Sequence, residues 1–240
     1  DKTLIVNLDK LAADLAVVLA QAQQGAILRD GLTVVLAGKP NAGKSSLLNA
    51  LAGNDAAIVT SVPGTTRDVL RERITLGGLP LNIIDTAGLR DSDNEIEQEG
   101  VRRAWKEIAS ADQILFVADA TETPNPNLKD LWPEYFELYP GSTQAVTLLL
   151  NKIDLSDHSP GRIDETTIAI SAKNGSGFDA LALHLQKTIG YLGHTEGLFS
   201  ARRRHLVALQ NALTFVQNGI AQLKGAGAGE LLAEDLRQAQ

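Results

Sequence analysis

Short apolar runs alternate with segments of helical spacing along the middle of the chain. The runs at Leu32–Ala37, Leu81–Ile84, Thr147–Leu150 and Thr167–Ile170 have the length and the largely apolar composition of buried strands, and the first is also rich in β-branched residues. A helical pattern over Ser46–Ala52 follows the first of them. Strands that alternate with helices in this way predict a doubly wound α/β sheet with helices on both of its faces.

One pair of runs breaks the alternation. Gly77 and Gly78 form a tight-turn signal between Arg71–Leu76 and Leu81–Asp85, with no room for a crossover helix. We therefore expect this pair to be an antiparallel hairpin, which makes the sheet mixed and mostly parallel. The α/β domain is expected to occupy residues 31–192.

Both ends of the chain have the spacing of amphipathic helices. In residues 1–30, one face carries Leu4, Leu8, Leu11, Leu15, Val18 and Leu19. In residues 193–240, apolar positions recur at alternating intervals of three and four, at Leu206, Leu209, Leu213, Val216, Ile220 and Leu223. Neither helix can bury its apolar face alone, so we expect the two to pack together in a helical bundle domain into which the α/β domain is inserted. Gly225–Gly229 is interpreted as a flexible break rather than a close helix contact, before a last amphipathic stretch at Glu230–Arg237.

The loop after the first predicted strand has the composition of a phosphate cradle. Residues 38–45 read Gly-Lys-Pro-Asn-Ala-Gly-Lys-Ser, which is the G-x-x-x-x-G-K-S pattern. Gly38 and Gly43 let backbone N–H groups converge, Lys44 reaches the terminal phosphates, and the Ser45 hydroxyl is a ligand for Mg²⁺. The N-terminus of the following helix adds a field that favours anions. This context favours a nucleotide site over a glycine turn without function.

A second group of strand-end residues indicates the base. Asn151-Lys-Ile-Asp154 follows the run Thr147–Leu150. The Asp154 carboxylate can accept two hydrogen bonds from N1–H and N2–H₂ of guanine, a donor pair that adenine lacks. Asn151 can brace the loop, and the stem of Lys152 can lie over the base. Ser171-Ala-Lys173 follows the next run and can bring a backbone N–H near guanine O6, although this tripeptide alone is weak support.

Two further segments suit the phosphate side of such a site. Asp85-Thr-Ala-Gly88 ends another apolar run, where an aspartate can hold Mg²⁺ through water and Gly88 can donate its N–H to a γ-phosphate. Thr65 and Thr66 lie in the loop before the hairpin. A threonine there can close on Mg²⁺ while the γ-phosphate is present and release it afterwards. The alternative is that the two threonines simply lead into a strand.

These motifs stand in the order of a G domain. The chain resembles the TrmE–Era branch of P-loop GTPases and, within it, the MnmE (TrmE) family of tRNA-modification GTPases. Four segments carry the resemblance: Gly38–Leu51, Pro63–Arg71, Asp85–Arg90 and Ala201–Leu206. The last of them lies outside the G domain and separates this family from Era and Der, which share the other three.

Together with the motifs, the resemblance implies a full set of site residues. The nucleotide ligands are expected to be Asn41, Ala42, Gly43, Lys44, Ser45, Ser46, Thr60, Ser61, Val62, Pro63, Gly64, Thr65, Thr66, Asp85, Thr86, Ala87, Gly88, Asn151, Lys152, Asp154, Ser171, Ala172 and Lys173. Mg²⁺ is expected on Ser45 and Thr66, and on Asp85 through water. The catalytic residues are expected to be Lys44, Thr66, Arg90 and Glu97.

The position that normally orients the attacking water is occupied by Leu89, which can neither donate nor accept a hydrogen bond. The resemblance implies Glu97 in this role and places Arg90 in the same switch. Side-chain chemistry alone does not choose Glu97 over Glu95 or Glu99.

Hydrolysis also needs positive charge near the β–γ bridge, for which composition offers Arg67 and Arg90. The resemblance implies a bound K⁺ instead, held by Asn41, Thr60, Val62 and Thr65, largely through backbone oxygens. The alternative for Asn41 is that its side chain stabilises the turn of the loop.

Composition narrows the remaining possibilities. The 240 residues suffice for one ordinary domain and an appendage, and the net charge of −7 gives no overall attraction to nucleic acid. For the basic patch Arg202–His205, ion pairs within the protein are favoured over contact with a tRNA phosphate. The absence of cysteine excludes disulfides and thiol catalysis, and the four histidines have no metal-binding spacing. No transmembrane run or signal peptide is present, so a cytoplasmic protein without membrane contact is expected.

The chain begins at Asp1 and contains no methionine, so we expect it to be a piece of a longer protein with the helical bundle domain truncated. The resemblance implies a folate-binding domain that supplies one-carbon units and a cysteine motif, both outside this sequence, with MnmG and tRNA as partners. The expected function is a K⁺-stimulated GTP hydrolase, activated by homodimerisation of its G domains, in an enzyme that modifies the wobble uridine of tRNA.

Two alternatives stay open. An Era- or Der-type ribosome-assembly GTPase predicts a KH-like RNA-binding domain or a second phosphate loop, and no second loop of this kind occurs in the sequence. A non-catalytic guanine-nucleotide scaffold is disfavoured by the intact Lys44, Ser45, Thr66 and Asp85.

Overall fold

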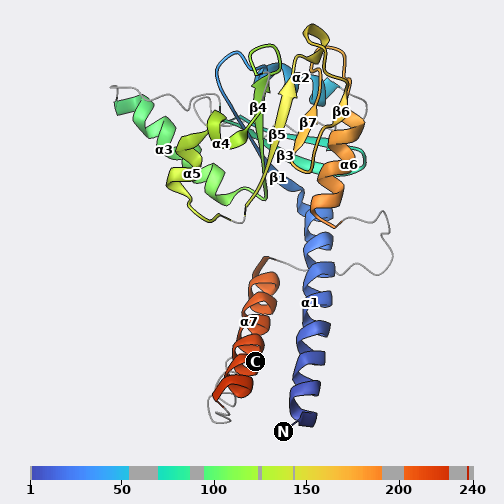
Figure 1. Ribbon diagram of the computed structural model, residues 1–240, viewed down its shortest axis with the longest axis vertical. Coiled ribbons are helices and arrows are strands. Elements are labelled where there is room, and N and C mark those ends of the chain that lie inside the picture. Colours follow the sequence, from blue (N-terminus) through green and yellow to red (C-terminus); the bar gives the residue numbers. More distant parts are fainter. Residues whose placement is uncertain are drawn as a thin grey trace. The chain divides into compact units, whose positions relative to one another are not determined.

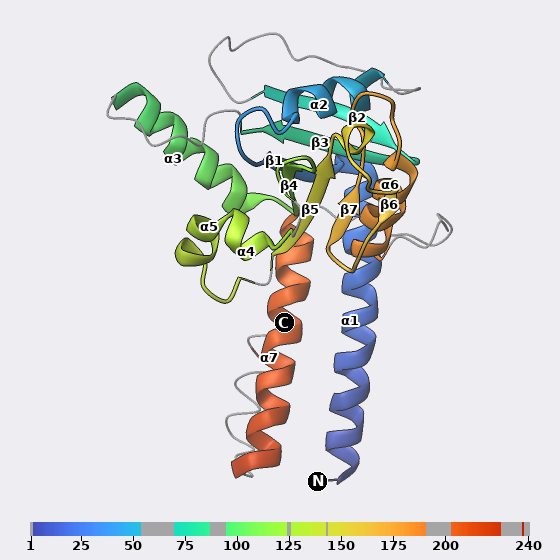
Figure 2. The ribbon, with the colours of Figure 1, turned by 45° about the horizontal axis from the view of Figure 1, so that its top comes forward.

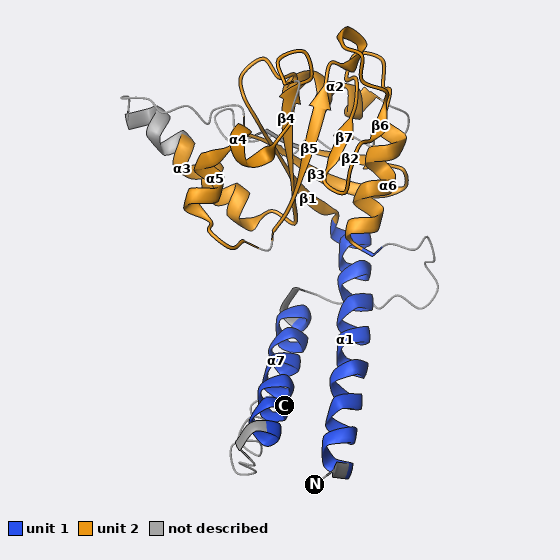
Figure 3. Ribbon diagram, in the orientation of Figure 1, with its two compact units in different colours: residues 1–30, 190–240 blue, residues 31–189 orange. Residues whose placement is uncertain are grey.

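The computed structural model describes residues 2–53, 70–86, 95–123, 126–142, 144–190, 203–226 and 237. It divides into two compact units, residues 31–189 and residues 1–30 with 190–240, which are described separately (Figure 3). Residues 227–236, which hold most of the last predicted amphipathic stretch, lie outside the described part. Within the described part, no helix is both long and apolar enough to span a bilayer.

A seven-stranded sheet forms the centre of the larger unit (Figure 1). Its strands are β1 (Leu32–Ala37), β2 (Leu70–Leu76), β3 (Leu79–Asp85), β4 (Gln113–Asp119), β5 (Ala145–Asn151), β6 (Gly161–Arg162) and β7 (Thr167–Ala169). They are ordered β2-β3-β1-β4-β5-β7-β6. The β2–β3 and β6–β7 pairs are antiparallel and the other neighbours are parallel. The predicted mixed, mostly parallel sheet is therefore confirmed.

The predicted hairpin is present between β2 and β3. Its turn is made by Gly77 and Gly78, whose φ angles are 57° and 83°. Positive φ at both central positions is the requirement of the tight hairpin turn whose twist matches that of the strands, and glycine meets it without steric cost.

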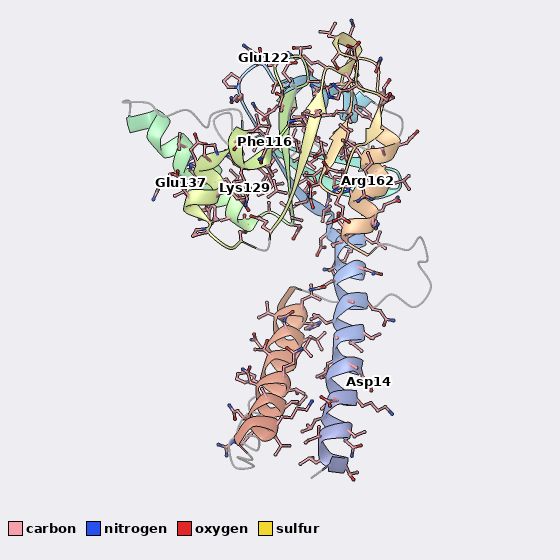
Figure 4. The ribbon with its side chains drawn as sticks, viewed as in Figure 1. Asp14, Phe116, Glu122, Lys129, Glu137 and Arg162 are labelled. Atoms are coloured by element: carbon pink, nitrogen blue, oxygen red, sulfur yellow. The ribbon has the colours of Figure 1, made fainter. Side chains whose placement is uncertain are left out.

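Helices cover both faces of the sheet (Figure 2). They are α2 (Lys44–Gly53), α3 (Glu95–Ser110), α4 (Leu128–Leu131), α5 (Pro133–Leu138) and α6 (Phe178–Thr188), with a short 3₁₀ turn at Ile153–Leu155. The face under α3, α4 and α5 carries an aromatic stack, in which Trp132 lies 5.0 Å from Phe116 and 4.7 Å from Tyr135 between ring centroids. Figure 4 shows Phe116 inside this layer. Both tryptophans of the chain lie in this layer, so their fluorescence reports on the α/β unit.

The smaller unit pairs α1 (Lys2–Asp30) with α7 (Arg203–Ala226), and the two run antiparallel (Figure 1). The apolar cluster between them consists of Leu8, Ala12, Leu15, Val216, Ile220 and Leu223. At its edge the Lys224 Nζ lies 3.0 Å from the Asp9 carboxylate. The predicted pairing of the two flanks is thus observed, and Leu213, Val216 and Ile220 of the predicted α7 seam are buried.

The predicted apolar face of α1 is partly wrong. Leu4, Leu11 and Val18 are 43%, 43% and 39% exposed, whereas Leu8 and Leu19 are buried. The contact line runs through Ala12, a residue that a search for large apolar side chains passes over. The helix is rotated so that this small side chain, rather than Leu11, faces α7.

Candidate nucleotide-binding site

The predicted site residues in the described part gather at one edge of the sheet, because parallel strands place their carboxyl ends together. The loop at 38–45 follows β1, Asp85 ends β3, Asn151 ends β5, and Ser171 comes soon after β7. Residues far apart in the sequence therefore form one surface at this edge.

The phosphate loop joins β1 directly to α2 and is closely packed against its neighbours. Gly38 has φ 134°, and a Cβ there would collide with the carbonyl oxygen of Val117. Gly43 has φ 95°, and a Cβ there would collide with the Asn151 side chain. Both positions accept only glycine, because each has a positive φ and neither has space for a Cβ. Because α2 begins at Lys44, the positive end of its dipole lies at this loop.

Lys44 reaches back into the same loop. Its Nζ donates to the carbonyl oxygens of Gly38, at 2.8 Å, and Lys39, at 2.9 Å. These bonds hold the ammonium group inside the curve of the loop, where an anion would meet it. Ser45 and Ser46 follow in the first turn of α2 and are exposed.

Asp85 is the candidate metal ligand, and its surroundings suit Mg²⁺. The residue is 5% exposed, and its Oδ1 has no hydrogen-bond partner in the described part of the chain. Burial raises the pKa of Asp85, while the charge of Lys44 and a hydrogen bond from Ser45 act in the opposite direction. A buried carboxylate oxygen without a partner, beside a serine hydroxyl, offers the oxygen ligands that Mg²⁺ prefers.

Thr86 has a structural role next to it. Its Oγ1 and its backbone N–H both donate to the Leu36 carbonyl oxygen, at 2.7 and 3.2 Å. The end of β3 is thereby fixed to β1, which places Asp85 beside the phosphate loop. The Thr86 hydroxyl is thus used within the fold, and the predicted nucleotide contact of this residue stays a prediction.

Asn151 links the loop after β5 (residues 151–157, the base loop) to the phosphate loop. The side chain is almost fully buried, with the residue 1% exposed. Its Nδ2 donates to the Ala42 carbonyl oxygen at 2.9 Å, and its Oδ1 accepts from the Ala172 N–H at 2.9 Å. One amide therefore ties three loops together, which is the bracing role expected from the sequence.

Asp154 is held in place by a neighbouring loop. Ser171 Oγ donates to Asp154 Oδ1 at 2.6 Å, and Lys173 Nζ lies 3.6 Å from Oδ2. The Ser171 hydrogen bond is the main cause that lowers the pKa of Asp154; burial opposes it, and the charge of Lys173 adds to it. The aspartate is therefore ionised at neutral pH, as the acceptor of two guanine N–H groups must be.

The sequence reasoning missed one residue of this edge. Asp119 ends β4, and its Oδ2 lies 2.6 Å from Lys152 Nζ. A carboxylate at the end of an apolar strand is the same signal that pointed to Asp85 and Asp154, so it was available in the sequence. No motif spacing connects it to Lys152.

The rest of the predicted site lies outside the described residues. This applies to Thr60, Ser61, Val62, Pro63, Gly64, Thr65 and Thr66 and to Ala87, Gly88, Leu89 and Arg90. Glu97 lies within α3, and its side chain is not among those described. The predicted contacts of these residues stay predictions.

An open, mostly parallel α/β sheet with a phosphate loop after one of its strands is the architecture of the P-loop GTPases. Residues 33–152 match the sequence profile of one family in that class, described as 50S ribosome-binding GTPase, and the chain belongs to this family. Its general ligands are GTP or GDP with Mg²⁺.

Curated relatives extend the similarity beyond the α/β unit. A "tRNA modification GTPase MnmE" of Marinobacter nauticus is 53% identical over 98% of this chain and 52% of its own length. A protein of the same name from Pseudomonas savastanoi is 55% identical over 97% of this chain and 52% of its own length. The chain thus spans about half the length of these relatives. A solved Era structure from Aquifex aeolicus is 27% identical, with a TM-score of 0.49 over 76% of this chain and 66% of its own.

Proposed function

We propose that the chain is the GTP-hydrolysing module of an enzyme that modifies the wobble uridine of tRNA. The observation that carries the GTP part is the fixed Asp154 carboxylate on the same sheet edge as Lys44. The tRNA part rests on the relatives that are named tRNA modification GTPases. Because those relatives do not bear the names Era or Der, a ribosome-assembly function is not favoured.

The phosphate end of the site has the following proposed roles. Lys44 neutralises charge on the terminal phosphates, while Ser45, Thr66 and, through water, Asp85 hold Mg²⁺. Bound Mg²⁺ would offset the charge that develops on the phosphate oxygens. Support comes from Asp85 Oδ1, which is buried and lacks a partner in the described residues, and from the hydrogen bond that Ser45 makes to the Asp85 carboxyl group.

The base end is proposed to read guanine through Asp154, with Lys152 beside the ring and a backbone N–H of the loop at residues 171–173 near O6. Asn151 and Ser171 hold these groups in position through the hydrogen bonds given above. The remaining predicted ligands, from Thr60–Thr66 and from Ala87 and Gly88, complete the proposal on the phosphate side.

We propose K⁺ as the further cation of the reaction, with Asn41, Thr60, Val62 and Thr65 as ligands. Asn41 has φ 65°, one of two non-glycine residues with positive φ in the described part, and it is exposed on the phosphate loop. Its exposed position on this loop makes the side chain available to a cation next to the phosphates. Glu97 would position the water that Leu89 cannot, and Arg90 would act in the same switch.

The wider assembly is also part of the proposal. G domains of two chains would pair in the GTP state, and MnmG and tRNA would join in the complete complex. A folate one-carbon donor would bind to a part of the protein that this chain does not include.

The test is GTP turnover in KCl and in NaCl at equal ionic strength, with Mg²⁺ constant. We expect faster turnover in KCl, and we expect Asn41→Ala to remove the difference between the salts. Asn174→Ala is the matched control and should keep the difference, because Asn174 is exposed and its Oδ1 accepts a local hydrogen bond from the Ser176 N–H. Equal rates in both salts would end the K⁺ proposal, and no turnover in either would favour the non-catalytic scaffold.

Dimerisation is tested separately by the sedimentation mass with GDP and with GDP–AlFₓ in KCl. The proposal expects a monomer with GDP and a dimer with the transition-state mimic. A monomer under both conditions, together with turnover that does not depend on K⁺, would refute activation by dimerisation.

A further inference from the structure

Asp119 sits where it can act on the base end of the site. It is the last residue of β4, and β4 is the strand between β1, which leads to the phosphate loop, and β5, which leads to the base loop. Figure 4 shows Glu122, a few residues further on, at the edge of the unit where these strands end. The Asp119 carboxylate meets the Lys152 ammonium at 2.6 Å, and the two side chains are only 11% and 32% exposed.

Hydrogen bonds that do not involve Lys152 also orient the Asp119 carboxylate. Its Oδ1 accepts from the Thr121 backbone N–H at 2.9 Å and from the Thr121 hydroxyl at 2.7 Å. Burial raises the pKa of Asp119, but the hydrogen bonds from Lys152 and Thr121 outweigh this and lower it overall. Asp119 is thus a charged group in a set orientation, with Oδ2 left for the lysine.

The Lys152 side chain, in contrast, is flexible by nature, because its four rotatable bonds give it many conformations to lose. Its backbone is in the left-handed region, with φ 66°, directly after the end of β5. A Cβ built on Gly43 would lie 4.0 Å from Lys152 Cε, so the lysine stem runs along the phosphate loop. The ion pair holds the stem in this position.

We propose that Asp119 is a positioning residue for guanine-nucleotide binding: it fixes the Lys152 stem as one wall of the base pocket before the nucleotide arrives. The inference rests on the proposed nucleotide site and adds a residue to it. Asp119 touches Lys152 rather than the base-reading Asp154, so it should set how tightly the nucleotide is held and not which base is chosen. Immobilising one flexible side chain in advance corresponds to about a two- to tenfold gain in affinity.

The test is a double-mutant cycle on GDP affinity, with Asp119→Asn, Lys152→Met and the two combined. Asp119→Asn should raise the Kd for GDP about two- to tenfold in the natural background. It should have no further effect in the Lys152→Met background, because the lysine through which it acts is gone. The same loss in both backgrounds, or no loss in either, would refute the proposal.

Inosine diphosphate, which lacks the exocyclic amino group, shows whether Asp119 acts through the contact that Asp154 makes to that group. Asp119→Asn should weaken GDP and inosine diphosphate by the same factor, because the Asp154 contact to the amino group is untouched. A change in the ratio of the two affinities would show that Asp119 acts through Asp154 instead. Asp119→Glu, which keeps the carboxylate, should recover part of the lost affinity.

Two controls keep the outcomes apart. Asp157→Asn removes the same charge from an exposed position further along the base loop and should leave the Kd for GDP unchanged. Tryptophan fluorescence in urea shows whether each variant is folded, and if Asp119→Asn is not, Thr121→Val tests the orientation of the same carboxylate. A natural chain that binds GDP but does not hydrolyse GTP would overturn the proposed function and leave this cycle fully informative.

Discussion

Replacing Asn151 by alanine tests how the loops of the site are held together. The substitution removes both hydrogen bonds of the amide, from Nδ2 to the Ala42 carbonyl oxygen and from the Ala172 N–H to Oδ1, each 2.9 Å long. Ala42 and Ala172 are both buried, at 3% and 8% exposed, so water cannot readily replace the lost partner. A buried polar group left unsatisfied costs about 1–3 kcal/mol, so with two such groups the unfolding free energy should fall by about 2–6 kcal/mol.

The loss should be visible in urea unfolding followed by tryptophan fluorescence, since both tryptophans lie in the α/β unit. A midpoint shift at constant m-value would place the effect in the native state. Asn174→Ala is the matched control: it removes one exposed hydrogen bond at the same sheet edge and should cost no more than about 1 kcal/mol. If Asn151→Ala costs no more than this control, the bracing role assigned to the amide is wrong.

Three further predictions concern other parts of the molecule. Ser171→Ala removes the main cause of the lowered pKa of Asp154. GDP binding needs the charged carboxylate, so as the pH decreases the affinity for GDP should begin to fall at a higher pH in the variant than in the natural chain. Superimposable pH profiles of the Kd would contradict this. Burial raises the pKa of Asp85, which makes its charged form unfavourable in the folded chain at neutral pH. Asp85→Asn should therefore raise the unfolding free energy without ligands, as measured by urea titration. It should also remove the Mg²⁺ dependence of GTP affinity, as measured by GTP titration with and without Mg²⁺. Val216→Ala should lower the unfolding free energy of the helical unit by about 1–3 kcal/mol, because it truncates a buried side chain. The transition followed by circular dichroism should therefore shift, while the transition followed by tryptophan fluorescence should not. Val207→Ala, at an exposed position, should change neither transition.

The elements of the α/β unit follow closely from local sequence pattern. β1 covers the predicted Leu32–Ala37, because a short run of apolar and β-branched residues bounded by glycines has few alternatives. The β2–β3 turn follows from the paired glycines, since their positive φ angles suit one tight hairpin turn. In both cases the deciding interactions lie within a few residues of each other along the chain.

The face of α1 illustrates where that reasoning stops. The apolar residues of this helix fit two adjacent lines, one through Leu8 and Leu15 and one through Leu4 and Leu11. Both lines satisfy helical periodicity, and only the partner decides between them. The structure chooses the line through Ala12, where a small side chain faces Val216 and Ile220. Alanine carries too little hydrophobic signal for the sequence alone to identify it.

The motifs predict the chemistry of the site and a bracing role for Asn151, but they do not predict the partners of the bracing side chains. The Asn151–Ala42 bond joins residues 109 apart in the sequence, and the Lys152–Asp119 pair joins residues 33 apart. Such contacts depend on the order of strands in the sheet, in which β4 lies between β1 and β5. A strand order cannot be obtained from the spacing of residues within one motif.

Base recognition and loop bracing are assigned to different side chains of the site, so substitutions of the two kinds should have different effects. The group proposed to read the base, Asp154, is separate from the groups that hold its surroundings, Asn151, Ser171 and Asp119. Discrimination against a base depends on carboxylate oxygens of Asp154 left without a donor, whereas affinity also depends on how little freedom the loops lose when the nucleotide binds. Substitutions at Asn151 and Asp119 should therefore weaken GDP and inosine diphosphate in parallel. A substitution at Asp154 should weaken GDP far more, because only GDP offers the second donor that its carboxylate accepts.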